Sequence, residues 1–230
     1  MSLKSNGGSD SKVLKAKTVL LVRHAESVEN VRVRAAKATW RRIRGLRLPQ
    51  ASQIWETLKL LGLQHDADLS EKGTAMASDA KVRLESSGLM NKVRPDLVVH
   101  STYIRAVKTY QLMLAPLTKT VPVVSSELLV ERKLSEHVYA ANGFRQRVAN
   151  FERWLDARPE VNVVVVGHSQ FFKQMLGVAC SVHKFDNCDV WEYRRSIDDS
   201  GKARWEEIGK RFSSELSVDE SKDCELEDSQ

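Results

Sequence analysis

The stretch KTVLLVRHAES, residues 17–27, decides the fold, because an unbroken apolar run at 19–22 stops at an Arg-His pair. Such runs are typical of strands that are buried on both faces of a sheet. In open α/β sheets, binding sites form beyond the carboxyl ends of the strands. Arg23 and His24 would place a fixed cation beside a titratable nitrogen there, which suits an anionic group. The alternative interpretation is a strand end whose polar side chains reach water.

A second apolar run ends in the same way. VNVVVVGHSQ, residues 161–170, is the most apolar stretch of the chain and stops at Gly167-His168. We expect His24 and His168 to leave neighbouring strands and meet in one crevice, together with Arg105, which lies one turn into the helix after a third strand. The other predicted strands are 95–100, 121–124 and two edge strands, 190–194 and 203–208, which would pair as a hairpin.

Amphipathic patterns predict helices between these strands. The positions that define them are Val33, Ala36, Trp40 and Ile43; Ile54, Leu58 and Leu61; Ala77, Ala80 and Leu84 after an N-cap at Ser70; Tyr103, Val107, Tyr110 and Leu114; Phe144, Val148, Phe151 and Leu155; and the stretch 171–180. Because strands and helices alternate, we expect an α/β fold, a three-layer α/β/α sandwich around a mostly parallel central sheet.

The length and charge of the chain indicate how it is divided into a domain and its terminal segments. We expect a flexible leader at 1–16, a single domain at 17–212 and an acidic, disordered tail at 213–230. The net charge is +6, and the tail holds seven acids against one Lys, so the rest of the chain carries +12. The leader lacks the apolar stretch of a secretory signal, and no run approaches the roughly 18 residues that span a membrane. Three cysteines without CxxC spacing favour a reducing, cytoplasmic location.

A strongly basic segment follows the first strand. Residues 31–50 contain seven Lys or Arg and no acid, and they open a basic helical insertion that we predict at 31–64. Its first helix should end at Gly45. Such a charge pattern attracts nucleic acid or a small substrate with several phosphates or carboxylates, unless it is only a solvated helix face. We favour the small substrate, and nucleic acid is the less favoured partner.

Five motifs, in order along the chain, resemble the signature of the histidine phosphatase superfamily, also called the phosphoglycerate mutase-like superfamily. They are LVRHAESVEN with Arg23 and His24; DADLSEKG with Leu69, Ser70 and Gly73; STYIRAVKT with Ser101, Arg105 and Thr109; LLVER with Glu131; and GHSQ with His168. One motif alone would be weak, but five in the right order are specific. The resemblance implies a phosphoglycerate mutase-like fold.

The resemblance also implies a mechanism. His24 would attack phosphorus and become a phosphohistidine, while Glu131 would protonate the leaving oxygen and then deprotonate the attacking water. Arg23, Arg105 and His168 would hold the equatorial oxygens of the phosphoryl group, where charge spreads in the transition state. Because these groups supply the positive charge, we expect no metal and no other cofactor.

Other assignments within this site are less specific. Ser27 and Asn30 follow the first motif at family spacing and are further candidates for contacts with phosphate. Glu127 and Glu136 lie near Glu131 and are alternatives to it as the general acid. The expected partner is a small phosphorylated substrate, with no membrane, and the oligomeric state stays open.

The chain departs from the family pattern in ways that bear on its activity. Ala25 stands where the family often has Gly, and we expect ordinary backbone there. The Gly-Trp-x-Asp-like and Tyr-Gly-x-Leu-like stretches of phosphoglycerate mutases are missing. We therefore favour a phosphomonoesterase over a phosphoglycerate mutase. A non-catalytic phospho-ligand binder is a third possibility, which the full set of motif residues disfavours.

Overall fold

The computed structural model describes residues 13–45, 66–132, 141–177 and 185–213. Several predictions lie outside these ranges. They concern most of the leader, the short helix of Ile54, Leu58 and Leu61, the alternative acid Glu136, and the acidic tail beyond residue 213.

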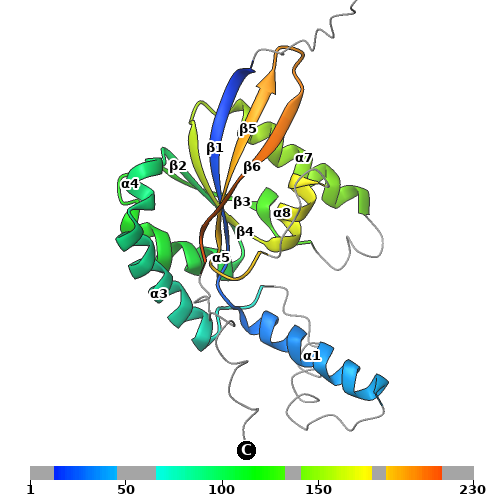
Figure 1. Ribbon diagram of the computed structural model, residues 1–230. Helices are drawn as coiled ribbons and strands as arrows, with labels where there is room; N and C mark the ends of the chain where they lie inside the picture. Colours follow the sequence, from blue (N-terminus) through cyan, green and yellow to red (C-terminus); the bar gives the residue numbers. More distant parts are fainter. Residues whose placement is uncertain (1–12, 46–65, 133–140, 178–184, 214–230) are drawn as a thin grey trace, which may run out of the picture.

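Within the described ranges, six strands form one sheet in the order β3-β2-β4-β1-β5-β6, which confirms the predicted fold class (Figure 1). The strands are β1 Val13–Arg23, β2 Leu97–Ser101, β3 Val123–Ser126, β4 Asn162–Gly167, β5 Val190–Asp198 and β6 Ala203–Phe212. The first four run parallel, whereas β5 is antiparallel to both β1 and β6. The hairpin of β5 and β6 is confirmed, but the prediction that both are edge strands is wrong for β5, which lies between β1 and β6.

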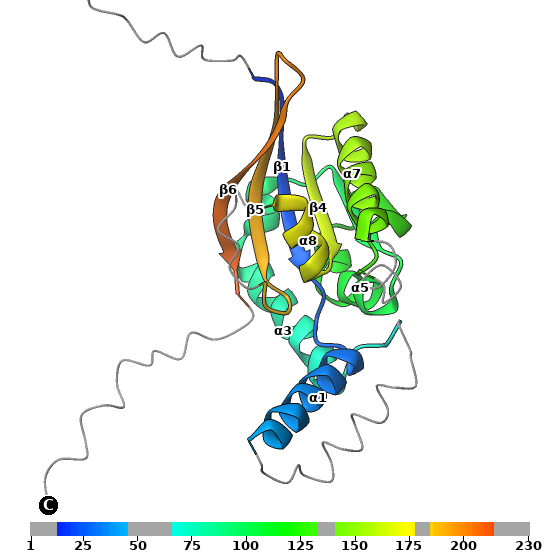
Figure 2. The ribbon, with the colours of Figure 1, turned by 90° about the vertical axis from the view of Figure 1, so that its right-hand side faces the viewer.

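Helices cover both faces of the sheet and complete the three layers. They are α1 Val28–Arg44, α3 Glu71–Ser87, α4 Leu89–Val93, α5 Ile104–Thr109, α7 Ala141–Ala157 and α8 Ser169–Leu176, with a π-helix at Tyr110–Leu114 and 3₁₀ turns at Ala115–Leu117 and Glu127–Leu129. Helices α3 and α4 lie on one side of the sheet, and α7 and α8 lie on the other (Figures 1 and 2). No helix within these ranges has the length and apolarity that crossing a membrane requires.

The apolar run of β1 supplies both halves of the core, because successive side chains of a strand point to opposite faces. Val19 and Leu21 pack with α7 and α8, whereas Leu20 and Val22 pack with α3. All four side chains are fully buried. A strand buried on both faces must be apolar throughout, which explains why this run shows no alternation.

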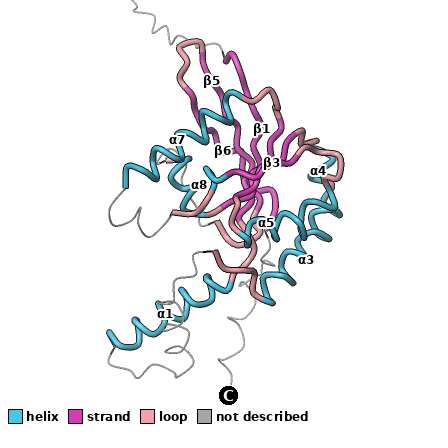
Figure 3. The backbone as a smooth tube through the Cα atoms, turned by 180° about the vertical axis from the view of Figure 1, so that it is seen from behind, coloured by secondary structure: helices cyan, strands magenta, loops and turns pink. Residues whose placement is uncertain are grey.

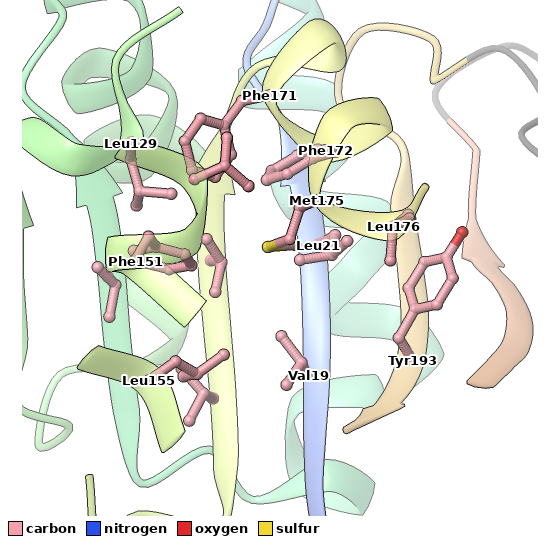
Figure 4. Packing of buried hydrophobic residues seen from close by; sticks show 14 of the residues in the cluster. Val19, Leu21, Leu129, Phe151, Leu155, Phe171, Phe172, Met175, Leu176 and Tyr193 are labelled. Carbon is pink, nitrogen blue, oxygen red and sulfur yellow. The ribbon is translucent and has the colours of Figure 1, made fainter. Parts of the chain in front are cut away.

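The predicted faces of α7 and α3 are confirmed. Phe144, Val148, Phe151 and Leu155 of α7 are buried, and Phe151 packs beside Phe171 of α8 over the sheet (Figure 4). Ala77, Ala80 and Leu84 of α3 are fully buried, and Ser70 caps this helix by accepting a hydrogen bond from the backbone N–H of Gly73.

The predicted inward face of the helix after β2 is confirmed at Leu114, which is fully buried, and holds only in part at the other three positions. Tyr103, Val107 and Tyr110 are only half-buried, whereas Arg105 and Thr109 are buried with the apolar residues around them. Thr109 faces inward because its hydroxyl accepts a hydrogen bond from the backbone N–H of Ala25. A pattern of apolar residues misplaces a helix face when polar side chains have partners inside the protein.

Helix α1 extends away from the sheet (Figures 1 and 3). It starts at Val28, three residues earlier than the predicted basic segment, and ends at Gly45 as predicted. Trp40 and Ile43, on its predicted apolar line, are 62% and 48% exposed.

The N-terminus of α3 packs against the backbone that follows β1. A Cβ atom on Gly73 would lie 1.9 Å from the carbonyl oxygen of Glu26, so only glycine permits this approach. The same oxygen accepts a hydrogen bond from the backbone N–H of Ser70. The contact fixes the position of the loop that carries the first motif.

Gly73→Ala should therefore destabilise the protein. Either α3 or the loop at Glu26 must move, and overpacking of this kind costs about 1–3 kcal/mol. Urea unfolding measures the change in the free energy of unfolding. Thr74→Ala, on the exposed side of the same helix, is the control and should have a much smaller effect. Equal stability of the Gly73→Ala and wild-type proteins would contradict the close packing.

Candidate active site

The parallel register of β1 and β4 brings the two histidines together. Arg23 pairs with Gly167 at the ends of these strands, and the backbone N–H of His24 donates a hydrogen bond to the carbonyl oxygen of Gly167 at 3.0 Å. The ring centroids of His24 and His168 lie 5.0 Å apart with an interplanar angle of 59°. Both side chains are buried. The two rings thus meet at the end of the sheet where the sequence predicts a crevice.

The ring of His24 is held in one tautomer. Its Nδ1 lies 2.7 Å from the carbonyl oxygen of Ala25, and since a carbonyl can only accept, Nδ1 carries the hydrogen. Burial, followed by the charges of Arg105 and Arg23, lowers the pKa of His24 well below its ordinary value. The ring is therefore neutral near pH 7, and the lone pair is on Nε2.

Ala25 acts through its backbone. Its N–H donates to the Thr109 hydroxyl at 2.9 Å while its carbonyl accepts from His24. Within the described ranges, the residues other than glycine with positive φ are Arg94 and Cys188, so Ala25 has the ordinary backbone that we expected. Replacing the family's frequent glycine with alanine leaves this geometry intact.

His168 forms the opposite wall of the crevice. Its Nε2 lies 3.0 Å from the hydroxyl of Ser101, at the end of β2, and Tyr103 meets its ring edge-on with centroids 5.4 Å apart. Its Nδ1 is buried and has no hydrogen-bond partner among the described residues. Burial, then the neighbouring His24 and Arg105, lowers the pKa of His168 well below its ordinary value. A second imidazole thus lies beside the first in its neutral form.

Arg105 lies next to both rings. It is buried, its guanidinium packs over the ring of Tyr103 with Cζ 4.8 Å from the ring centroid, and Nη1 pairs with Glu29 at 2.7 Å. The alternative of a surface cation is thereby excluded, although Arg105 does pair with an acid. Its charge is one cause of the lowered pKa of His24 and His168.

Arg23 contributes the second guanidinium. Its Nη1 donates to the carbonyl oxygen of Phe185, and its Nε is buried without a hydrogen-bond partner among the described residues. Its charge also lowers the pKa of both histidines. The crevice therefore combines two guanidinium groups with two neutral imidazoles, a set that suits an oxyanion-rich group.

Glu131 lies just after the 3₁₀ turn that follows β3. Burial raises the pKa of its carboxyl group above the ordinary value, against the lowering effects of the Arg132 backbone N–H and of Arg105 and Arg23. The side chain of Arg147 on α7 donates to the carbonyl oxygen of Glu131 at 3.4 Å and fixes this segment. Glu127, the alternative acid within the described ranges, is exposed.

Ser27 and Asn30 have structural partners in the loop. Ser27 is fully buried and accepts a hydrogen bond from the Asn30 backbone, while the Asn30 side chain accepts one from the Ser27 backbone. This capping box starts α1. Asn30 also lines a cleft beside Arg23. Contact of either side chain with phosphate stays a prediction.

Three contributions to the site were not assigned a role from the sequence. Ser101 contacts His168, Thr109 holds the backbone at Ala25, and Glu29 pairs with Arg105. Ser101 and Thr109 belong to the STYIRAVKT motif, so the sequence marked both residues but did not indicate what they contact. Glu29 is the single acid of α1, and the sequence offers no signal for its partner.

Comparisons with known proteins support this description. The family model of the histidine phosphatase superfamily (branch 1) matches residues 51–140, which include Ser101, Arg105 and Glu131 but neither histidine of the crevice. A search of curated proteins finds no match.

Several solved structures share the fold. A mycobacterial glucosyl-3-phosphoglycerate phosphatase is 17% identical, with 86% of this chain and 100% of that chain covered and a TM-score of 0.54. The alpha-ribazole phosphatase from Shigella flexneri is 17% identical, with 87% and 98% covered and a TM-score of 0.51. A phosphoserine phosphatase from Entamoeba histolytica is 12% identical, with 87% and 100% covered and a TM-score of 0.50.

These structural matches establish the shared fold, and the family model adds a match in sequence. Together with the five motifs, they confirm that this chain resembles the histidine phosphatase superfamily (branch 1).

Proposed function

We propose that the chain is a phosphomonoesterase that forms a phosphohistidine on His24 and needs no metal ion. The observation that carries this proposal is the fixed tautomer of His24, which leaves Nε2 unprotonated. The ring of His168 lies beside it, with the two ring centroids 5.0 Å apart. A neutral imidazole is a good nucleophile near pH 7. The expected substrate is a small anionic phosphate ester.

The reaction would proceed in two in-line transfers. In the first, Nε2 of His24 forms a bond to phosphorus while the bond from phosphorus to the ester oxygen breaks, and Glu131 gives its proton to that oxygen. In the second, water attacks phosphorus, Glu131 takes a proton from the water, and the bond to Nε2 breaks. Inorganic phosphate is released, and both side chains return to their initial states.

Positive charge around the transferred group would do most of the catalytic work, since phosphoryl transfer depends mainly on positioning and electrostatics. Arg23 and Arg105 would hold two of its oxygens, and the buried ring of His168 would hold the third. The Nδ1 of His168 and the Nε of Arg23, both buried without partners among the described residues, are suitable donors. Low dielectric in this crevice strengthens each of these bonds.

Cys188 is another nucleophilic side chain near the strand ends, and its environment disfavours it. Burial, with the nearby charge of Asp189, raises the pKa of its thiol to about 12. The reactive form of cysteine is the thiolate, so this side chain is unreactive near neutral pH. His24 is thus the better candidate.

A phosphoglycerate mutase would use the same crevice but return the phosphoryl group to its substrate. The missing mutase stretches of the sequence favour hydrolysis, and the three structural neighbours described above are named as phosphatases. A non-catalytic binder would retain the arginines, but it would not need a nucleophile held in one tautomer.

His24→Ala should abolish hydrolysis of nitrophenyl phosphate, because the proposed mechanism transfers the phosphoryl group to Nε2 of His24. Brief reaction of the wild-type protein with ³²P-labelled substrate should yield an acid-labile, base-stable label that the variant lacks. His24→Gln retains more of the side-chain volume and should give the same result. Thermal unfolding checks that both variants are folded, and turnover retained by either variant would exclude the covalent mechanism.

The pH dependence of kcat/KM should reflect two shifted groups. His24 must be neutral, and because its pKa is lowered, activity should persist well below pH 6.5 before it falls. Glu131 must be protonated in the first transfer, and because its pKa is raised, activity should fall as pH rises through a value above 4.5. The expected profile is a bell whose acid limb lies well below pH 6.5 and whose alkaline limb lies above pH 4.5.

Glu131→Gln tests the assignment of the alkaline limb. This variant should lose that limb and release alcohol from an alkyl phosphate about 10²–10⁴ times more slowly. The first-turnover burst from nitrophenyl phosphate should slow far less, because nitrophenolate leaves without a proton. Glu127→Gln is the matched control. An unchanged profile in Glu131→Gln would assign the proton to another group.

A further inference from the structure

A cleft of about 320 Å³ adjoins the crevice at the junction of β1, α1 and α3. Two of its lining residues connect it to the nucleophile. Arg23 immediately precedes His24, and Asn187 donates a hydrogen bond from its side chain to the carbonyl oxygen of His24 at 2.7 Å. Helices α1 and α3 approach each other beneath this end of the sheet (Figure 2), where Ser27 and Leu69 form a β-bridge. The cleft therefore lies beside the backbone of the nucleophile, and Arg23 borders both.

The lining of this cleft is mostly cationic. Arg34 and Lys37 come from α1, Lys72 comes from the first turn of α3, and Arg23 comes from the end of β1. The carboxylates that line it are Glu26 and Asp186, so four cations face two acids. Asn30, Arg34 and Lys37 are four and three residues apart, which places them on one face of α1.

Within this lining, Glu26 pairs with Arg34 and holds its guanidinium in place. The Glu26 side chain is 4% exposed, one carboxylate oxygen accepts from Ser70 at 2.8 Å, and the other pairs with Arg34. Burial would raise the pKa of Glu26, but the hydrogen bonds from Arg34 and Ser70 hold it below the ordinary value. Glu26 therefore stays ionised and holds the guanidinium of Arg34 at the cleft.

Lys37 and Lys72 have no comparable partner. Both side chains are exposed, and neither forms an ion pair with another described residue. Val33 and Met76 line the cleft beside them and offer an apolar surface for a short carbon chain. The cleft thus presents two lysines that form no ion pair with another described residue, one guanidinium held by Glu26, and an apolar wall.

We propose that this cleft binds a second anionic group of the substrate, a phosphate or a carboxylate separated from the scissile phosphate by a short carbon chain. The inference rests on the proposed function for the identity of the scissile group. It assigns the basic side of α1 to substrate selection, because Arg34 and Lys37 lie on the helix face that lines the cleft. Substrates with one anionic group would place no charge of their own against Lys37 and Lys72.

Three phosphonates with the same three-carbon chain test this proposal by calorimetry, because a phosphonate binds without being hydrolysed. Propylphosphonate has one anionic group, 3-phosphonopropionate adds a carboxylate, and propane-1,3-bisphosphonate adds a second phosphonate. We expect one or both of the latter to bind the wild-type protein at least about ten times more tightly than propylphosphonate. The stronger of the two identifies which second group the cleft prefers.

The double variant Lys37→Gln/Lys72→Gln should lose this preference, with the Kd values of the three compounds converging. Lys81→Gln/Lys119→Gln removes the same charge from positions that do not line the cleft, and it should keep the preference. Equal Kd values in the wild-type protein, or a preference that survives in the first double variant, would overturn the proposal. Turnover of nitrophenyl phosphate is measured separately, so that loss of the proposed function is distinguishable from loss of the second site.

Discussion

The parallel pairing of β1 with β4 is the constraint on which the site depends. Parallel neighbours end at the same edge of a sheet, and the register that pairs Arg23 with Gly167 makes the next residue of each strand a histidine. A register shifted by one residue would turn every β1 side chain to the opposite face and separate the two rings. Burial of Val19 and Leu21 on one face, and of Leu20 and Val22 on the other, opposes such a shift.

The register alone would not orient His24 for the proposed attack on phosphorus. The backbone of Ala25 links His24 to Thr109 on α5, so the ring is oriented by a helix that follows a different strand. Gly73 and Ser70 hold the same loop from the side of α3. Three elements distant in sequence therefore fix one tautomer, and burial, followed by the charges of Arg105 and Arg23, lowers the pKa of the ring and keeps it neutral. Electrostatics and geometry favour the same state of the ring.

The sequence predicted most of the fold because its strands are buried on both faces and its helices have clear apolar stripes. It failed at β5, whose run from Val190 resembles an edge strand until its pairing with β1 is known. It also failed in part for the inward face of the helix after β2, because Arg105 and Thr109 are buried there by specific partners rather than by apolarity. Periodicity measures hydrophobicity, and it cannot detect polar residues that a site draws inside.

In the candidate site, too, the sequence reveals residues that lie in local motifs and misses contacts between residues far apart in the chain. Short motifs identified His24, His168, Arg23 and Arg105, because each motif encodes a local strand end or helix start. Glu29 has no such motif, and its pairing with Arg105 depends on where α1 meets α5. Ser27 and Asn30 illustrate the converse, since their spacing is equally typical of a capping box, which is the role that the structure gives them.

The two halves of the proposed site differ in how much the fold constrains them. The crevice at His24 is built from strand ends and buried hydrogen bonds, so its chemistry is tied to the scaffold and to folding itself. The adjoining cleft is formed by exposed side chains of α1 and α3, where Lys37 and Lys72 contribute little to packing. Substitutions there can alter the preferred substrate at small cost in stability, because surface positions tolerate change. A scaffold with this division can retain phosphoryl transfer while its substrates diverge.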